Sequence, residues 1–223
     1  MFKNLLEFWK GKDFLTQVLE EFKKMLDDTE KMFGSVCRRL IYNEKEPGLE
    51  DKIYAIDKNV NELQRDIRKR IVEHLSIQPS VDVPTSLLLM SVVKDAERLG
   101  DYAKNLLEII DLLEKPMNRE LYSKLFNVME KDILELFKKT KEAFIESDEA
   151  QARTSWKFET KIKNRCNEII EKAAKSNLTV NEAVCFALTA RYFKRIAAHL
   201  TNIATSVIVP LSDLDYFDEK HRP

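Results

Sequence analysis

The sequence predicts an all-α protein in which two tandem three-helix repeats form one elongated six-helix bundle. The 223 residues include only four glycines and six prolines, too few for the turns of an all-β fold or for the glycine-rich loops of a nucleotide-binding α/β fold. Hydrophobic residues make up 44% of the chain and charged residues 34%, as expected for helices with one buried and one solvated face. Prolines separate long segments of helical periodicity, and they therefore mark the expected helix boundaries.

The first repeat is predicted over residues 13–115. Its first helix covers about 13–43 and ends before Pro47-Gly48. Its second helix covers 50–76, because apolar residues recur there three and four positions apart on one face: Ile53, Ile56, Val60, Leu63, Ile67 and Ile71.

The third helix follows a loop bracketed by two prolines and runs to about Glu114, with Asp82 as its expected N-terminal cap. Its first half is apolar almost all round. We therefore expect this helix to be the buried central member of the bundle.

The second repeat is predicted over residues 116–210. It contains a fourth helix over about 118–146, a fifth over about 149–175, and a sixth that begins at the capping box Thr179–Glu182 and ends near Val209. The buried stripe of the fourth helix is expected at Leu121, Leu125, Val128, Leu136 and Phe144.

The two ends of the chain are expected to lie outside the repeats. Residues 1–12 form an amphipathic segment that we expect to pack on the bundle, with a membrane-surface helix as the alternative. The charged tail, residues 211–223, is expected to be loosely docked.

Two stretches of the first half recur in the second half, which indicates an internal duplication. Asp57-x-x-Val60 in the second helix matches Glu159-x-x-Ile162 in the fifth, and residues 97–106 match residues 194–203. Each half therefore repeats the same three-helix unit.

Four polar residues of the first repeat form a candidate metal site. Glu97 and Asp101 are four residues apart, as are Asp57 and Asn61, so each pair lies on one helix face beside the apolar stripe. Oxygen ligands of this kind suit a hard cation. The alternative is an ordinary solvated face.

The counterparts of these residues in the second repeat are not expected to bind metal. Glu159 keeps the carboxylate, but Lys163, Lys194 and Ala198 replace the other three residues, and a lysine repels a cation. Residues 153–195 contain ten Lys and Arg against four Glu, which suits an anion site or an acidic partner. The alternative is a solvated basic face.

Several functional classes are excluded. The net charge of −1 argues against a nucleic-acid binder, and no apolar run has the length of a membrane span. No motif for nucleophilic, zinc or phosphate-loop chemistry occurs, so we expect no enzyme activity. Three widely spaced cysteines suggest reduced, buried thiols of a cytoplasmic protein: Cys37, Cys166 and Cys185.

The duplicated stretches resemble the signature of the PhoU family of phosphate-uptake regulators. Residues 97–105 match the pattern E-R-[IL]-G-D-x-[AT]-x-N, and residues 194–202 are a degenerate copy that keeps Arg195, Ile196, His199, Thr201 and Asn202. The stretch Asp57–Asn61 is also similar to a family pattern, and the resemblance extends over roughly 13–209.

This resemblance implies a cytoplasmic, non-enzymatic adaptor, often a homodimer, that reaches the membrane only through its partners. Those partners would be the ATPase or permease of a phosphate transporter or a histidine sensor kinase, both restrained when phosphate is plentiful. The resemblance also implies iron, zinc or another divalent or trivalent metal in the first repeat, on Asp57, Asn61, Glu97 and Asp101. The alternatives are a metal-binding helical bundle, an accessory protein of a sodium–phosphate or low-affinity phosphate permease, and a structural module.

Overall fold

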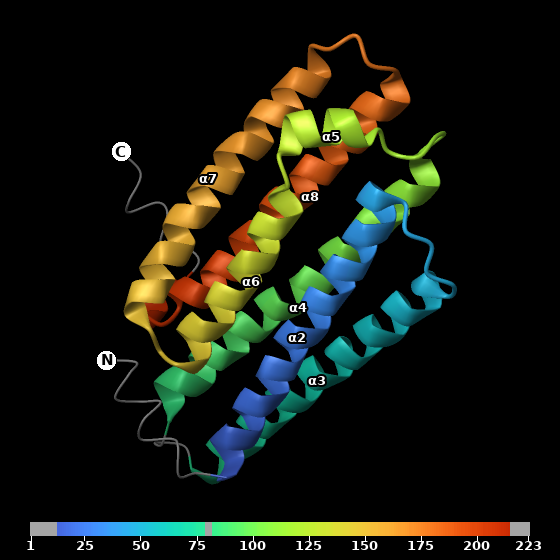
Figure 1. The fold of residues 1–223 in the computed structure, drawn as a ribbon. Helices are drawn as coiled ribbons and strands as arrows, with labels where there is room; N and C mark the ends of the chain where they lie inside the picture. Colours follow the sequence, from blue (N-terminus) through green and yellow to red (C-terminus); the bar gives the residue numbers. More distant parts are fainter. Residues whose placement is uncertain (1–12, 79–81, 215–223) are drawn as a thin grey trace.

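The computed structural model describes residues 13–78 and 82–214, and within these ranges the chain is helical throughout its regular structure (Figure 1). This confirms the all-α fold. The expectations for residues 1–12 and for most of the tail lie outside the described residues. The helices are α2 (Asp13–Tyr42), α3 (Leu49–Ile77), α4 (Val83–Leu112), α5 (Arg119–Phe126), α6 (Met129–Ile145), α7 (Glu149–Ala174) and α8 (Val180–Thr205), followed by a 3-10 turn, η1 (Leu211–Asp213).

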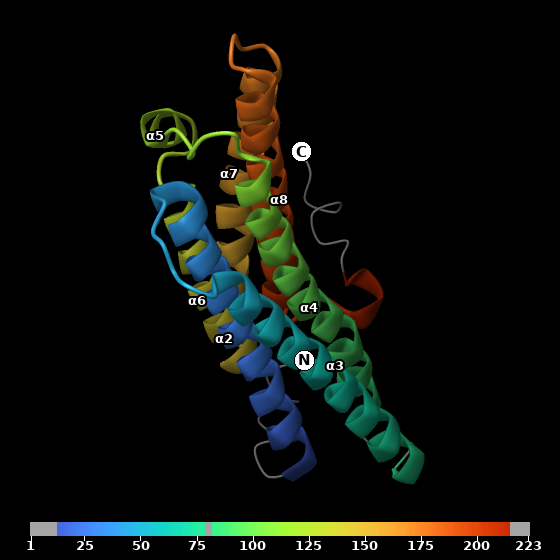
Figure 2. The same ribbon diagram turned by 90° about the vertical axis from the view of Figure 1, so that its right-hand side faces the viewer.

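The helices form one elongated bundle in which the two repeats pack side by side. α4 packs against α8, and α2 packs against α6, so these four helices form the centre (Figures 1 and 2). α3 and α7 flank them on opposite edges. The prediction that the third helix is central is confirmed, because α4 is buried along most of its length.

Aromatic side chains from both repeats form one continuous core. The ring of Phe22 in α2 lies 4.8 Å from that of Phe144 in α6. Phe33 of α2 lies 5.9 Å from Phe137 of α6 and 5.6 Å from Phe193 of α8, measured between ring centroids. Each buried aromatic ring stabilises the fold by about 1.5–3 kcal/mol. The two repeats therefore share one hydrophobic core.

The predicted fourth helix is in fact two helices, and this is the main correction to the expected fold. Asn127 and Val128 lie between the end of α5 and the start of α6, and both residues have left-handed backbone angles (φ 46° and 56°). Val128, expected on the buried stripe, is 41% exposed. A β-branched residue is strained in this conformation, so the break must be stabilised by contacts elsewhere.

A buried carboxylate beside the break supplies such contacts. Glu130, in the first turn of α6, is 3% exposed and accepts hydrogen bonds from two tyrosine hydroxyls. Tyr122 of α5 donates to Oε2 at 2.7 Å, and Tyr42 at the end of α2 donates to Oε1. Glu130 thereby ties α5 and α6 to the first repeat.

Two helix ends also differ from the prediction. α8 ends at Thr205 rather than Val209, and the chain continues as a turn. Asp82 occupies the cap position of α4, but its side chain does not cap that helix; it lies 3.4 Å from the ring of His74 in α3. The capping box at the start of α8 is confirmed, with Thr179 and Glu182 bonded reciprocally.

No described helix is long and apolar enough to cross a membrane.

Candidate functional site

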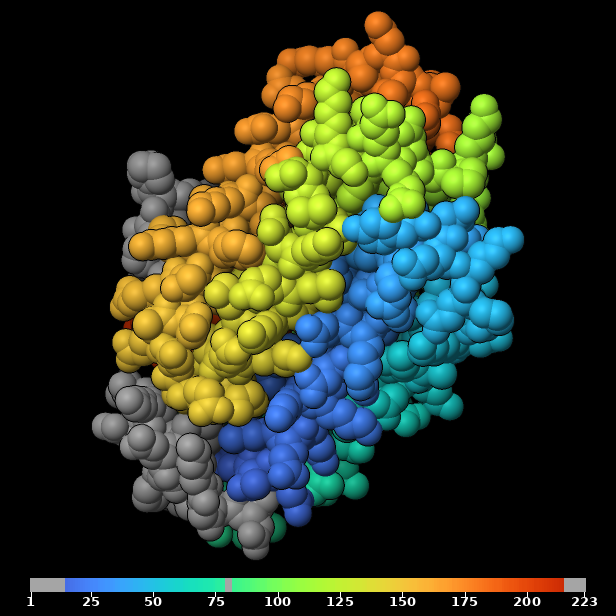
Figure 3. Space-filling model, viewed as in Figure 1, coloured from blue at the N-terminus to red at the C-terminus, as the bar shows by residue number. Residues whose placement is uncertain are grey.

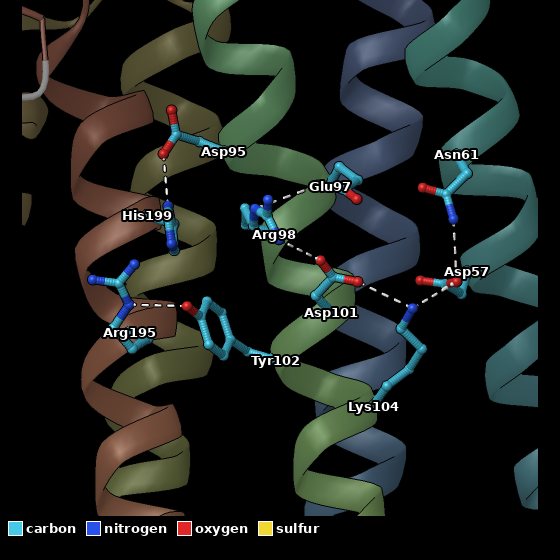
Figure 4. Close-up of polar contacts among 10 residues, drawn as sticks. All are labelled: Asp57, Asn61, Asp95, Glu97, Arg98, Asp101, Tyr102, Lys104, Arg195 and His199. Atoms are coloured by element: carbon cyan, nitrogen blue, oxygen red, sulfur yellow. Dashed lines mark hydrogen bonds and ion pairs between the residues drawn. The ribbon is translucent and has the colours of Figure 1, made fainter.

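The four predicted metal ligands lie on facing helices of the first repeat (Figure 4). Asp57 and Asn61 project from α3, and Glu97 and Asp101 project from α4. The side-chain amide of Asn61 donates to Oδ2 of Asp57 at 3.2 Å. Asp57 is 8% exposed, so its carboxylate lies at the packed seam between the two helices and not on a solvated face. The structure therefore places the two predicted pairs on facing helices of the first repeat.

A lysine ammonium group lies between the carboxylates. Nζ of Lys104 donates to Oδ2 of Asp57 at 2.9 Å and lies 3.0 Å from Oδ1 of Asp101. Burial alone would lower the pKa of this ammonium, but its hydrogen bonds to the two carboxylates outweigh that effect and the pKa is raised. Lys104 is therefore charged at neutral pH and neutralises the cluster.

Glu97 lies at the edge of the same cluster. Burial raises the pKa of its carboxyl group, and the nearby charge of Asp101 raises it further. Arg98 partly offsets this, because its guanidinium lies 3.9 Å from Glu97 and 3.0 Å from Asp101. The side chain of Arg98 is 46% exposed, so its attraction for both carboxylates is weakened by solvent.

These residues do not fit a metal ion as they stand. A metal would need the carboxylate oxygens of Asp57 and Asp101, and Lys104 already bonds to one oxygen of each. Among the residues that the structure describes, no three His, Cys, Asp or Glu side chains are gathered closely enough to hold a metal ion. Iron or zinc at the first repeat thus stays a prediction from the resemblance.

The second-repeat counterparts also place a lysine beside a buried carboxylate. Glu159 of α7 is 4% exposed, and Nζ of Lys163 lies 3.7 Å from it on the same helix. Lys194 of α8, in the position that corresponds to Glu97, donates to Oδ1 of Asn167 at 2.7 Å. Ala198 offers no ligand atom. Of the four compared positions in the second repeat, the one acidic residue is therefore Glu159.

A second polar cluster, which the sequence did not reveal, joins the two repeats at the seam between α4 and α8 (Figure 4). Oδ1 of Asp95 lies 2.7 Å from Nδ1 of His199 and accepts a hydrogen bond from Asn202 at 3.2 Å. Tyr102 stacks on His199, with 5.6 Å between the ring centroids, and its hydroxyl accepts from Nε of Arg195 at 3.0 Å. The duplicated signature was the available signal, because its second copy keeps Arg195 and Asn202 while its acidic residues change.

A groove with a basic rim runs along α7, where it faces α5 and α6. It has a volume of about 520 Å³ and an apolar floor that includes Met129 and Ile162. Nε of Arg165 donates to the backbone carbonyl of Leu125 at 3.3 Å, so this arginine also holds the end of α5 against α7. Figure 3 shows α5, α6 and α7 side by side on one face of the molecule. The charged residues of the groove are Lys124, Lys161, Arg165 and Lys172, against Asp132 and Glu168.

Curated relatives match most of this chain. It is 21% identical over 188 residues to the phosphate-specific transport system accessory protein PhoU homolog of Clostridium acetobutylicum, a match that covers 78% of this chain and 85% of that protein. It is 25% identical over 167 residues to PhoU homolog 1 of Thermotoga maritima, which covers 70% of each protein.

Solved structures share the fold. The phosphate transport system regulatory protein PhoU of Streptococcus pneumoniae superposes with a TM-score of 0.76 at 16% identity, covering 87% of this chain and 93% of that one. PhoU of Pseudomonas aeruginosa superposes with a TM-score of 0.73 at 20% identity, covering 87% and 95%. The family model described as the PhoU domain matches twice, at residues 22–110 and 126–207, which is more than half of the chain. With both halves matched and the bundle shared, the chain belongs to the PhoU family.

Proposed function

We propose that this protein is a non-enzymatic adaptor that restrains phosphate uptake and phosphate signalling when phosphate is plentiful. Its partners would be the ATPase or permease of a phosphate transporter, or a histidine sensor kinase. The observation that carries this proposal is the match of the PhoU domain model to both repeats. The curated relatives are named as accessory proteins of phosphate-specific transport systems, which supports the same role. In this proposal the protein is cytoplasmic and reaches the membrane through its partners.

The described side chains support a role without catalysis. The thiols of Cys37, Cys166 and Cys185 are buried, and burial raises the pKa of each, that of Cys166 to about 12. A thiol with a raised pKa is a poor nucleophile at neutral pH. His74 and His199 each lie against a carboxylate in the bundle.

The groove along α7 is the surface that we propose for partner docking. Its four cations outnumber its two carboxylates, and its floor is apolar, so it suits a partner segment that is acidic with apolar side chains. Rim charges of this kind mainly increase the rate at which an oppositely charged partner associates. Docking here leaves the acidic cluster between α3 and α4 free of the partner.

Affinity capture from phosphate-replete cells, read by mass spectrometry, tests the proposal. The wild-type protein is expected to recover a phosphate-transporter ATPase, a phosphate permease or a sensor kinase. Recovery of a sodium–phosphate or low-affinity permease instead would favour that alternative system. Absence of all of these from both replete and starved cells would refute the adaptor role.

Charge reversal tests the groove separately. The triple variant K124E/K161E/K172E changes three exposed lysines of the groove and is expected to lose most of the partner recovered by the wild type. The matched control, K23E/K24E/K31E, reverses three exposed lysines on α2 and is expected to keep it. Equal recovery by both variants would show that the partner docks elsewhere, while the adaptor role would stand.

A further inference from the structure

The acidic cluster of the first repeat contains carboxylates, as a metal site would, but the cation between Asp57 and Asp101 is the ammonium group of Lys104. Lys104 follows Asp101 by three residues, so both project from the same face of α4 toward α3. The ammonium bonds to Asp57 at 2.9 Å and to Asp101 at 3.0 Å, and the lysine side chain is 20% exposed. These are the distances of charge-assisted hydrogen bonds, which are about twice as strong as neutral ones.

The surroundings favour a charge in this position. Asp57 is nearly buried, and an unpaired buried carboxylate would be strongly destabilising. Gly100 lies one turn before Lys104, and even a Cβ added there would be in van der Waals contact with that carboxylate, at 3.4 Å from Oδ1 of Asp57. α3 therefore packs close to α4 with Asp57 at the contact, and some cation must neutralise it.

The second repeat also places a lysine beside a buried carboxylate. The carboxylate that corresponds to Asp57 is Glu159, which is also nearly buried, and Lys163 lies 3.7 Å from it. The two lysines come from different helices, α4 in the first repeat and α7 in the second. Lysine therefore neutralises the buried carboxylate in both halves, by two different routes.

We propose that Lys104 is a tethered cation that replaces a metal ion in the first repeat, so that the folded protein takes no metal there. A metal ion that entered would have to displace the ammonium from both carboxylates. The displaced ammonium would stay close to the metal ion and repel it. The stability of this protein is then independent of metal supply and unchanged by a chelator.

The test is a titration with Mn²⁺, a hard cation that carboxylates bind. Binding is measured from the electron paramagnetic resonance signal of the free ion. The wild type is expected to show no saturable binding. The variant Lys104→Met removes the charge but keeps an unbranched side chain. We expect it to bind one Mn²⁺ at least tenfold more tightly than the wild type does. Changing Asp101→Asn in the same variant should abolish the gain, and Mn²⁺ should raise the melting temperature of Lys104→Met alone.

Lys163→Met is the matched control. Lys163 lies 3.7 Å from Glu159, which is also nearly buried, but Glu159 is the one acidic residue among the four compared positions of the second repeat. Because a single carboxylate is a poor metal site, loss of this lysine is expected to create no Mn²⁺ site. A gain of equal size in both variants would overturn the proposal, because it would be a general effect of removing a lysine.

Two other results would also overturn it. The first is saturable Mn²⁺ binding by the wild type that Asp57→Asn abolishes, and the second is no gain in a folded Lys104→Met. If that variant does not fold, reductive methylation of the wild type decides the question by mass spectrometry. We expect slow methylation of Lys104 that Mn²⁺ does not change, whereas faster methylation on addition of Mn²⁺ would show that the metal displaces the ammonium.

Discussion

Nδ1 of His199 in α8 lies 2.7 Å from Oδ1 of Asp95 in α4, and this pair links the two repeats across the centre of the bundle. Asp95 is 7% exposed, and Asn202 supplies a further hydrogen bond to the same oxygen. Tyr102 stacks on the histidine ring and is in turn contacted by Arg195. Three residues of the second copy, Arg195, His199 and Asn202, therefore take part in the contacts that hold the two repeats together.

The coupling between Asp95 and His199 can be measured by a double-mutant cycle. Asp95→Ala and His199→Ala are each expected to lower the free energy of unfolding by about 1–3 kcal/mol, because each leaves a buried polar partner with fewer hydrogen bonds. The coupling energy is expected to be about 1 kcal/mol or more in urea unfolding. The exposed pair Lys69–Glu73, at 3.8 Å, is the control, with an expected coupling of about 0.3–0.5 kcal/mol. A coupling for Asp95 and His199 no larger than that control would contradict the prediction.

Glu130 is expected to stabilise the junction between α5 and α6. Glu130→Gln replaces one acceptor oxygen by an amide donor, so the hydroxyls of Tyr42 and Tyr122 can no longer both donate to it. We expect a loss of about 1–3 kcal/mol in the free energy of unfolding. Glu135→Gln, at a half-exposed side chain of the same helix, is the control and should change stability by less than about 0.5 kcal/mol. Equal stabilities for the two variants would refute the role of Glu130.

Val128→Gly is expected to stabilise the protein. The left-handed backbone of Val128 costs about 1–3 kcal/mol for a β-branched residue, and glycine removes that cost while losing up to about 1 kcal/mol through chain entropy. The net gain should be about 0.5–1 kcal/mol in urea unfolding. The same change at Val72, an exposed position within α3, should instead cost about 0.3–0.5 kcal/mol, because glycine is a poorer helix former than valine. Destabilisation by Val128→Gly would mean that the break is not strained.

Alkaline pH is expected to weaken the same junction. Burial and the hydrogen bond to Glu130 raise the pKa of Tyr42 from 10.0 to about 12, and burial raises that of Tyr122 well above 10.0. Because the folded protein favours the neutral hydroxyls, their stabilising contribution is present below pH 10 and is lost as the pH rises from about 10 to about 12. Urea unfolding across this range should show a steeper fall in stability for the wild type than for Tyr42→Phe. If stability fell equally with pH in the wild type and in Tyr42→Phe, ionisation of Tyr42 would not weaken the junction.

The helices and the duplication could be read from the sequence because both depend on local patterns. Apolar residues three and four apart predicted α3, and the Thr179–Glu182 capping box predicted the start of α8. The same periodicity placed Asp57 and Glu97 beside the packing stripes of adjacent helices, so their approach could be expected. A residue's face on a helix follows from its position in the chain alone.

The tertiary structure alone decided the rest. Beside the break at Asn127 and Val128, Glu130 bonds to Tyr42, which lies 88 positions away along the chain, and no local pattern reports such a contact. The four dihedral angles of a lysine side chain can carry its ammonium in many directions, so only the packing of α3 on α4 directs Lys104 to Asp57. Local sequence thus determined where the helices lie and which faces they bury, whereas long-range packing determined which charges meet between them.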